Sequence, residues 1–399
     1  IFIMAKVKGF KALRYNEEKV NNISDVIAPP YDVINKEQQE HLYSLHENNI
    51  IKVDLNKTEG DTKYEEAKSI FNSWINDQVL IQEEKECIYP YHQTFTYKGK
   101  DYERIGIIAL VKLSEFSDKI ILPHEETFSG PKADRLKLMK SCKTNISPIF
   151  GVYDNSDNKV EKLVKEFIKS NNPIIEAKSL DGIMNKLWKI DNFQTISEIS
   201  SYFETKEILI ADGHHRYETS LNYHRENPDS ETENVMFYLT GTIQEGLLIN
   251  PTHRILNKTS SSKDITGSVL ESFYTEKWLG DMNEDSLEPD EFFYIDKKND
   301  TNLKCKIKEK DLVSFYSMSV YAVQEKIIDL FKESYENVGH FKSLEDAKST
   351  INSESIGLIL PKFIPADIMK VVLNNDKMPQ KSTYFYPKVA TGLLFNKLY

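Results

Sequence analysis

Residues 208–219 read ILIADGHHRYET, and this stretch gives the clearest indication of the fold. Its four leading apolar residues are typical of a strand that is buried on both faces. Gly213 allows a sharp turn and a close approach of the backbone to a ligand. The polar residues that follow predict a helix over 214–226, whose first N–H groups have no partner within the helix. We therefore expect an α/β architecture with an anion site at this turn.

The side chains of this turn suggest chemistry as well as shape. Gly213, His214 and Arg216 are the residues we expect to hold phosphate groups, because a guanidinium forms paired hydrogen bonds with phosphate. Asp212 is expected to bind a metal ion or to accept a proton, and His215 to act in catalysis. Either histidine could instead be a satisfied core residue. A zinc site is not favoured, since the spacing differs from H-E-x-x-H.

A second polar stretch, PHEETFSGPKADR, covers residues 123–135. A glycine–proline pair leads into a predicted helix, and acids lie beside bases, which suits anion binding, Mg²⁺ or proton transfer. The candidate residues are His124, Glu125, Glu126, Lys132 and Arg135. We assign the first three to catalysis, Glu126 together with Asp212 to the metal, and the two bases to the cofactor. The alternative is an ordinary solvated charged loop.

A third stretch, MPQKSTYFYPK, covers residues 378–388 and offers Lys381, Ser382 and Thr383 as donors to a cofactor. A C-terminal strand with aromatic packing explains it equally well. Two shorter stretches, APPYDVI at 28–34 and NPTHR at 250–254, place further polar groups on a backbone stiffened by proline. Only six of the 51 basic residues are arginines, and four of those lie in or beside these stretches, which favours an anionic ligand.

Composition excludes several classes of protein. The 399 residues are 40% hydrophobic and 28% charged, as in globular proteins, so a disordered or collagen-like chain is excluded. The net charge of −11 disfavours a nucleic-acid partner. No apolar run is long enough for a membrane span. Three scattered cysteines without a C-x-x-C pair indicate reduced thiols and a cytoplasmic protein.

Periodicity predicts mixed α and β structure along the whole chain. We expect helices over 36–48, 62–77, 133–143, 158–170, 180–205, 214–226, 264–274, 322–333 and 343–352. We expect strands over 87–96, 102–113, 149–153, 208–211, 235–243, 246–250, 291–296, 303–308, 312–318 and 356–360. A polar run at 259–262 suggests a boundary near 260 between an N-terminal α/β part, residues 1–260, and a C-terminal α+β part, residues 261–399.

Five of these motifs together resemble a bacterial and archaeal family known as domain of unknown function 1015. They are APPYDVI at 28–34, HEET at 124–127, ADGHHRYET at 211–219, PTHR at 251–254 and MPQKSTYFYPK at 378–388. The resemblance covers nearly the whole chain. The family name implies no activity.

The sequence Asp212-Gly213-His214-His215-Arg216, between a strand and a helix, also resembles the signature of the ParB/sulfiredoxin fold. That resemblance implies a nucleotide-binding core over about residues 100–260, elaborated by the C-terminal part. Members of that fold include CTP-hydrolysing DNA-segregation proteins, sulfiredoxins and free-serine kinases. The turn here has no cysteine, which disfavours sulfiredoxin chemistry, and the acidic balance disfavours DNA segregation.

These resemblances imply a nucleotide-dependent phosphotransferase that uses ATP or ADP with Mg²⁺. Its substrate would be a small hydroxylated metabolite, with serine or phosphoserine as the first choice. A phosphoserine-type phosphatase with the same anion site is one alternative, and a non-catalytic nucleotide or metabolite sensor is another. We expect a small-molecule partner, no nucleic acid, no membrane and a homo-oligomer as one possibility.

Overall fold

The computed structural model describes residues 5–125, 129–259, 265–374 and 376–398. The chain divides into two compact units. Unit 1 comprises residues 1–123, 127–247 and 387–399, and unit 2 comprises residues 124–126 and 248–386. The chain therefore leaves unit 1 after residue 247 and returns to it at residue 387. The boundary expected near residue 260 lies within unit 2.

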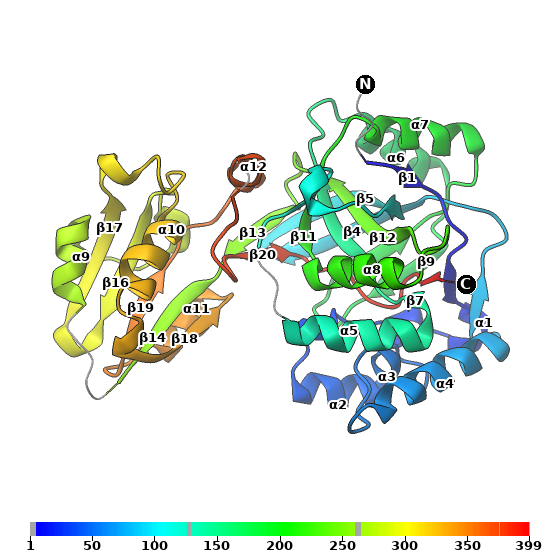
Figure 1. Cartoon of the computed structure of the whole chain (residues 1–399), viewed down its shortest axis with the longest axis horizontal. Helices are drawn as coiled ribbons and strands as arrows, with labels where there is room; N and C mark the ends of the chain where they lie inside the picture. Colours follow the sequence, from blue (N-terminus) through cyan, green and yellow to red (C-terminus); the bar gives the residue numbers. More distant parts are fainter. Residues whose placement is uncertain (1–4, 126–128, 260–264, 375, 399) are drawn as a thin grey trace. The chain divides into compact units, whose positions relative to one another are not determined.

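A nine-stranded mixed sheet forms the centre of unit 1 (Figure 1). In order across the sheet its strands are β6 (Ile121–Pro123), β11 (Ile208–Asp212), β8 (Ile149–Tyr153), β12 (Asn234–Gly241), β5 (Lys100–Lys112), β4 (Tyr89–Tyr97), β10 (Met184–Leu187) and β9 (Ile175–Lys178), while β1 (Val7–Lys8) pairs with β5. The strand β11 runs parallel to β6 and antiparallel to β8. The expected pairing of the two long strands, β4 and β5, is confirmed.

Helices pack against this sheet because each has an apolar face. The helices α6 (Lys159–Ser170) and α7 (Phe193–Phe203) share one buried core with the inward-facing residues of β5, β8, β11 and β12. The helix α8 (His214–Glu226) adds Tyr217 and Leu221 to that core. On its other side α8 contacts α5 (Ser129–Cys142), which contacts α4 (Thr62–Asn76), and Figure 1 shows these three as successive layers. The turn before α8 is thus held by the sheet and by α5.

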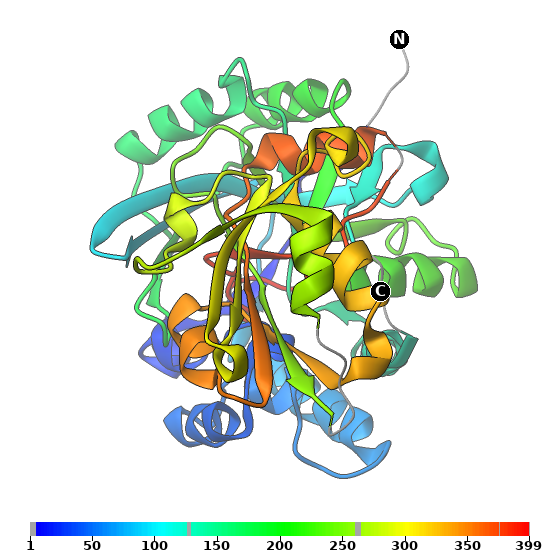
Figure 2. The same cartoon turned by 90° about the vertical axis from the view of Figure 1, so that its left-hand side faces the viewer.

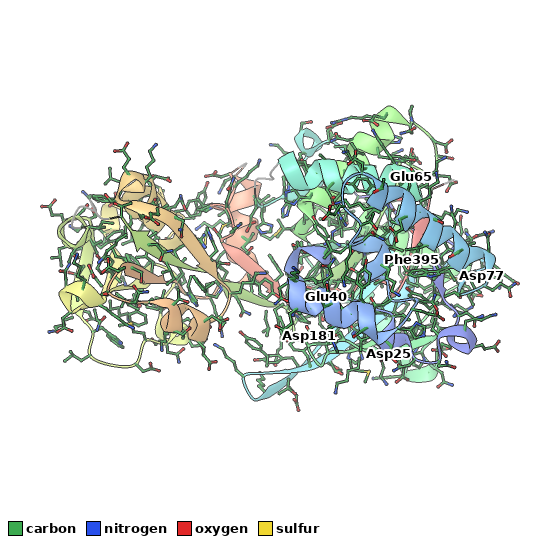
Figure 3. All side chains as sticks on the ribbon, turned by 90° about the horizontal axis from the view of Figure 1, so that it is seen from below. Asp25, Glu40, Glu65, Asp77, Asp181 and Phe395 are labelled. Carbon is green, nitrogen blue, oxygen red and sulfur yellow. The ribbon has the colours of Figure 1, made fainter. Side chains whose placement is uncertain are left out.

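The last residues of the chain belong to the core of unit 1. Phe395 packs edge-on against Phe71 of α4 and against Tyr15, with ring centroids 5.4 Å and 5.9 Å apart. Figure 3 labels Phe395 beside α4, which carries Glu65 and ends before Asp77. Edge-to-face pairs of this kind stabilise the fold beyond their buried area. This packing brings the segment from residue 387 onward back to the first unit.

The remaining elements of unit 1 are short or peripheral. They are β2 (Leu13–Tyr15), α1 (Glu17–Val20), α2 (Lys36–Leu45), α3 (Ile51–Asp54), β3 (Leu80–Gln82), β7 (Thr144–Asn145), β21 (Asn396–Lys397) and the 3₁₀ turns η1 (Ile23–Asp25), η2 (Tyr31–Val33) and η3 (Phe116–Asp118). The pairing of β21 with β7 joins the C-terminal segment to the loop that precedes β8.

Unit 2 is built on a six-stranded antiparallel sheet (Figure 2). Its strands, in order, are β15 (Phe273–Lys277), β17 (Thr301–Ile307), β16 (Glu291–Asp296), β19 (Ser355–Ile359), β14 (His253–Lys258) and β18 (Tyr335–Phe341). Phe293 and Ile295 share a core with α11 (Leu344–Thr350). Tyr294, between them, hydrogen-bonds Thr266 of α9 (Thr266–Ser272). Because neighbouring strand residues point to opposite faces, helices cover both faces of this sheet.

Unit 2 has four further strands and helices, besides short 3₁₀ and π-helical segments. They are the paired strands β13 (Leu248–Pro251) and β20 (Thr383–Tyr386) and the helices α10 (Ser319–Val323) and α12 (Pro365–Leu373). Together the two units confirm the expected mixture of α and β structure. No helix within the described ranges combines the length and apolarity that crossing a membrane requires.

Two predictions of local structure are wrong. The helix expected over 180–205 is a strand, β10, followed by α7. Apolar residues at 183, 187 and 188 suit helical spacing, but pairing with both β4 and β9 satisfies the backbone of β10 better. The strand expected over 312–318 is a series of turns, since Tyr316 and Ser317 have φ of 52° and 55°. A strand does not accommodate two left-handed residues in succession.

Candidate functional site

The Asp212 turn, which we define as residues 212–216, joins the end of β11 to the start of α8. Gly213 has φ of +94°, a left-handed conformation that side chains rarely adopt. A Cβ atom there would lie 2.9 Å from the Nε and Nη2 atoms of Arg216. Glycine is therefore required both by the backbone and by the guanidinium that folds against it. No side chain caps the start of α8.

Asp212 lies between two cations. Its Oδ2 accepts a hydrogen bond of 2.7 Å from Arg216 Nη2, and its Oδ1 accepts one of 2.5 Å from Lys388 Nζ. All three side chains are largely buried. Burial alone would raise the pKa of Asp212, but Lys388 and Arg216 outweigh it and lower that pKa to about 2. The carboxylate is thus ionised at neutral pH and is a weak base.

Arg216 is fixed by the loop before β8 as well as by Asp212. Its Nη1 donates to Ser147 Oγ at 3.0 Å and to the carbonyl oxygen of Pro148 at 2.6 Å. A guanidinium has five N–H donors, and these contacts use three of them. Arg216 therefore holds the turn against the sheet. It also keeps N–H groups that donate to no acceptor among the described residues.

His215, on the first turn of α8, lies beside an ion pair that joins α5 to α8. Lys132 of α5 pairs with Glu218, one turn along the helix from the histidine. Burial lowers the pKa of His215, Glu218 opposes this, and Lys132 reinforces it. A half-buried histidine with a lowered pKa is mostly neutral at pH 7 and can accept a proton. The catalytic role expected for His215 stays a prediction.

Arg135 of α5 forms a buried cluster next to the turn. Its Nη1 donates to Asp54 Oδ1 at 2.8 Å, and its Nε donates to Asp134 Oδ2 at 2.9 Å. Its guanidinium lies over the ring of Tyr31, with Cζ 4.0 Å from the ring centroid. Burial lowers the pKa of Arg135, but the two carboxylates more than compensate and raise it. Arg135 is therefore charged, and its partners come from three separate segments.

Unit 2 contains the other candidate residues in a group of its own. His124 Nε2 lies 2.9 Å from Thr383 Oγ1, and Thr383 Oγ1 donates to Glu125 Oε1 at 3.2 Å. His124 is almost fully buried. Ser382 is buried too, and its hydroxyl donates to the carbonyl oxygen of Pro379. Thr383 thus connects the acid and the histidine, while Ser382 shapes the loop.

A buried arginine holds that loop in place. Arg254 donates to the carbonyl oxygens of Thr252, Gln380 and Lys381 at 2.8–3.0 Å. Burial lowers the pKa of Arg254 to about 10, so it remains charged at neutral pH. Lys381 itself is exposed, with φ of 53°. The loop therefore presents the Lys381 side chain outward from a fixed backbone.

The structure thus brings the predicted residues together in two groups. The group in unit 1 contains Lys132, Arg135, Asp212, Gly213, His214, His215 and Arg216. The group in unit 2 contains His124, Glu125, Lys381, Ser382 and Thr383. Glu126 lies outside the described residues. Within the described part of the chain no three acidic, histidine or cysteine side chains gather as a metal site, so a metal at Asp212 and Glu126 stays a prediction.

Sequence reasoning missed two residues of the first group. Lys388 stands at the end of the polar stretch 378–388, which did signal a site, but its partner Asp212 is 176 positions away. Asp54 has no motif around it and meets Arg135 only through the packing of α3, α4 and α5. No local pattern identifies such a residue.

Comparison with known proteins identifies a family. The model of the family described as "Protein of unknown function (DUF1015)" matches residues 7–332. No curated protein matches the chain.

Some solved structures are distantly similar. A conserved hypothetical protein from Pyrococcus furiosus is 13% identical with a TM-score of 0.38, the match covering 73% of this chain and 97% of that one. SbnI with a C-terminal truncation, from Staphylococcus aureus, is 12% identical with a TM-score of 0.41, covering 71% and 85%. A free serine kinase variant in complex with AMP is 12% identical with a TM-score of 0.40, covering 73% and 94%.

Proposed function

The chain belongs to the DUF1015 family, and we propose that it is a nucleotide-dependent phosphotransferase. It would move a phosphoryl group between ATP or ADP and a small hydroxylated metabolite, with serine and phosphoserine as the first candidates. The observation that carries this proposal is the Asp212 turn. There a left-handed glycine opens an uncapped helix beside Arg216 and Lys388.

Phosphoryl transfer depends mainly on positioning and on neutralising negative charge, and the turn suits both tasks. The start of a thirteen-residue helix attracts anions through its backbone N–H groups. Gly213 has no side chain to keep phosphate oxygens from the backbone. Arg216 and Lys388 supply two fixed positive charges beside it. We assign Gly213, His214 and Arg216 to the nucleotide phosphates.

The acidic and histidine residues divide the remaining tasks. Asp212 is ionised, and its carboxylate oxygens are hard donor atoms of the kind that Mg²⁺ prefers. Proteins often bind Mg²⁺ through one carboxylate together with substrate phosphates. When bound, the ion would neutralise phosphate charge. His215, largely neutral, would accept the proton of the acceptor hydroxyl. Lys132 and Arg135 lie on α5 beside the turn and would steady the acceptor.

Unit 2 has a second set of proposed roles. We assign acid–base catalysis to His124, Glu125 and Glu126 and cofactor binding to Lys381, Ser382 and Thr383. Thr383 Oγ1 donates to Glu125 and can accept from His124 Nε2, and these two contacts support the first assignment because they orient both groups.

The proposal is tested by titrating the purified full chain with ADP and with ATP, each with and without Mg²⁺, in a calorimeter. Arg216→Ala should weaken ADP binding by about tenfold or more, the usual effect of losing a charged hydrogen-bond donor. Arg225→Ala is the matched control, because Arg225 lies at the other end of α8 in an exposed pair with Glu115. Equal ADP affinity in the two variants would refute the assignment of the turn. Binding of phosphoserine with no nucleotide response would favour the phosphatase.

A further inference from the structure

A small cavity lies behind the Asp212 turn in unit 1. Its volume is about 40 Å³, and it is lined by residues of α3, α5 and α8, by Tyr31 and by the segment before β8. A buried water needs roughly 10–15 Å³, so the cavity has space for about three water molecules. It is too small for a nucleotide. It can accept one end of a small molecule.

Two buried side-chain atoms on its wall have no hydrogen-bond partner among the described residues. They are Asp54 Oδ2 and Thr219 Oγ1, and their residues are 4% and 1% exposed. Leaving a buried polar atom without a partner costs about 1–3 kcal/mol for a neutral group and more for a charged one. Two such atoms on one small cavity indicate that something polar occupies it.

Two charged side chains on the cavity wall match a ligand with two kinds of polar group. Asp54 is paired with Arg135 through Oδ1, and its Oδ2 has no partner among the described residues. Arg216, also on the wall, donates to Asp212, Ser147 and Pro148 with three of its five N–H groups. The matching ligand has a hydrogen-bond donor for Asp54 Oδ2. It has a negative group for the remaining donors at the Arg216 end.

We infer that this cavity binds the amino group of a zwitterionic α-amino acid, held by Asp54 Oδ2 with Thr219 Oγ1 beside it. The carboxylate of the amino acid meets the Arg216 end. An ammonium group donates three hydrogen bonds and fills the space of one water, so it satisfies Asp54 without crowding the cavity. The inference rests on the proposed function in one respect, because it makes this amino acid the phosphoryl acceptor.

Calorimetric titration without nucleotide tests the inference on the full chain. The probes are L-serine, glycine, D-glycerate and ethanolamine, of which glycerate lacks the amino group and ethanolamine the carboxylate. L-Serine should bind, and the last two should bind at least about tenfold more weakly. If the cavity holds only water, none of the four probes binds, and that result would overturn the inference.

Two variants locate the binding. Asp54→Asn keeps an oxygen for Arg135 but turns a donor toward the ammonium group, so L-serine should bind about 10- to 100-fold more weakly. Thr219→Val has nearly the same shape and should weaken the binding of L-serine. The melting temperature of the free protein should be unchanged or higher, because the substitution removes a buried unpaired hydroxyl. Unchanged L-serine affinity in both variants would contradict the assignment.

The two proposals can fail separately. L-Serine that binds in an Asp54-dependent way, without any nucleotide-dependent transfer, would keep this site and remove the proposed function. Efficient phosphoryl transfer to glycerate would keep the function and overturn the amino-group site.

Discussion

Lys388→Met tests the ion pairs that hold the Asp212 turn. Lys388 Nζ lies 2.5 Å from Asp212 Oδ1, and the two side chains are 12% and 14% exposed. Methionine retains most of the apolar length of lysine but not the charge. Arg216 remains on the other carboxylate oxygen. The variant should therefore fold and lose one of two ionic partners.

The size of the effect follows from the pKa of Asp212. Burial would raise it, yet Lys388 first and Arg216 second bring it down to about 2. A pKa lowered from the ordinary value of an aspartate to about 2 corresponds to roughly 2–3 kcal/mol of stability. Lys388 is the larger of the two contributions, so we expect Lys388→Met to lower the free energy of unfolding of unit 1 by about 1–2 kcal/mol at pH 7.

The pH dependence has a definite sign. A carboxyl group whose pKa is lower in the folded state stabilises the protein above its unfolded pKa, near 4, and loses this contribution as the pH falls through about 2. The difference between wild type and variant should be constant from pH 7 to about pH 5 and shrink below about pH 4.

Urea unfolding with tryptophan fluorescence measures this effect in unit 1. Trp74 and Trp188 are both buried there, and a Trp278→Phe background removes the tryptophan of unit 2. Lys140→Met is the matched control, because Lys140 forms an exposed pair with Glu226 that should contribute under about 1 kcal/mol. Equal losses in the two variants at pH 7 would contradict a special contribution of the buried pair, as would a Lys388→Met loss undiminished at pH 3.

Two further substitutions test the backbone around the candidate residues. Gly213→Ala should destabilise unit 1 by about 1–3 kcal/mol in thermal unfolding, because φ of +94° and the Arg216 guanidinium both oppose a side chain; an unchanged melting temperature would show that the turn relaxes freely. Arg254→Met removes the anchor of two carbonyl groups in the loop at 380–381. Limited trypsin digestion should then cut after Lys381 several-fold faster, and an unchanged rate would contradict the anchoring role.

The turn was predictable from sequence because its signals are local. The expected strand over 208–211 and helix over 214–226 match β11 and α8 almost residue for residue. A run of apolar residues, one glycine and a helical polar pattern determine this stretch without help from the rest of the chain. The same holds for β4 and β5, which are joined by a short turn.

Non-local contacts explain what the sequence could not reveal. The strand β10 exists because β4 and β9 pair with it, and its own residues suit a helix equally well. The two partners of Asp212 and Arg135 that escaped prediction, Lys388 and Asp54, lie 176 and 81 positions away. Charge pairs at such separations leave no periodic pattern in a chain where lysine is the usual cation.

The most direct test of the central claim is phosphorus NMR of the full-length protein with ATP, Mg²⁺ and L-serine. We expect a new phosphomonoester signal that grows in step with ADP, is lost in Arg216→Ala and is kept in Arg225→Ala. Absence of that signal with every small hydroxylated acceptor, under conditions where ADP binds, would contradict it. Release of inorganic phosphate from phosphoserine without nucleotide would contradict it as well.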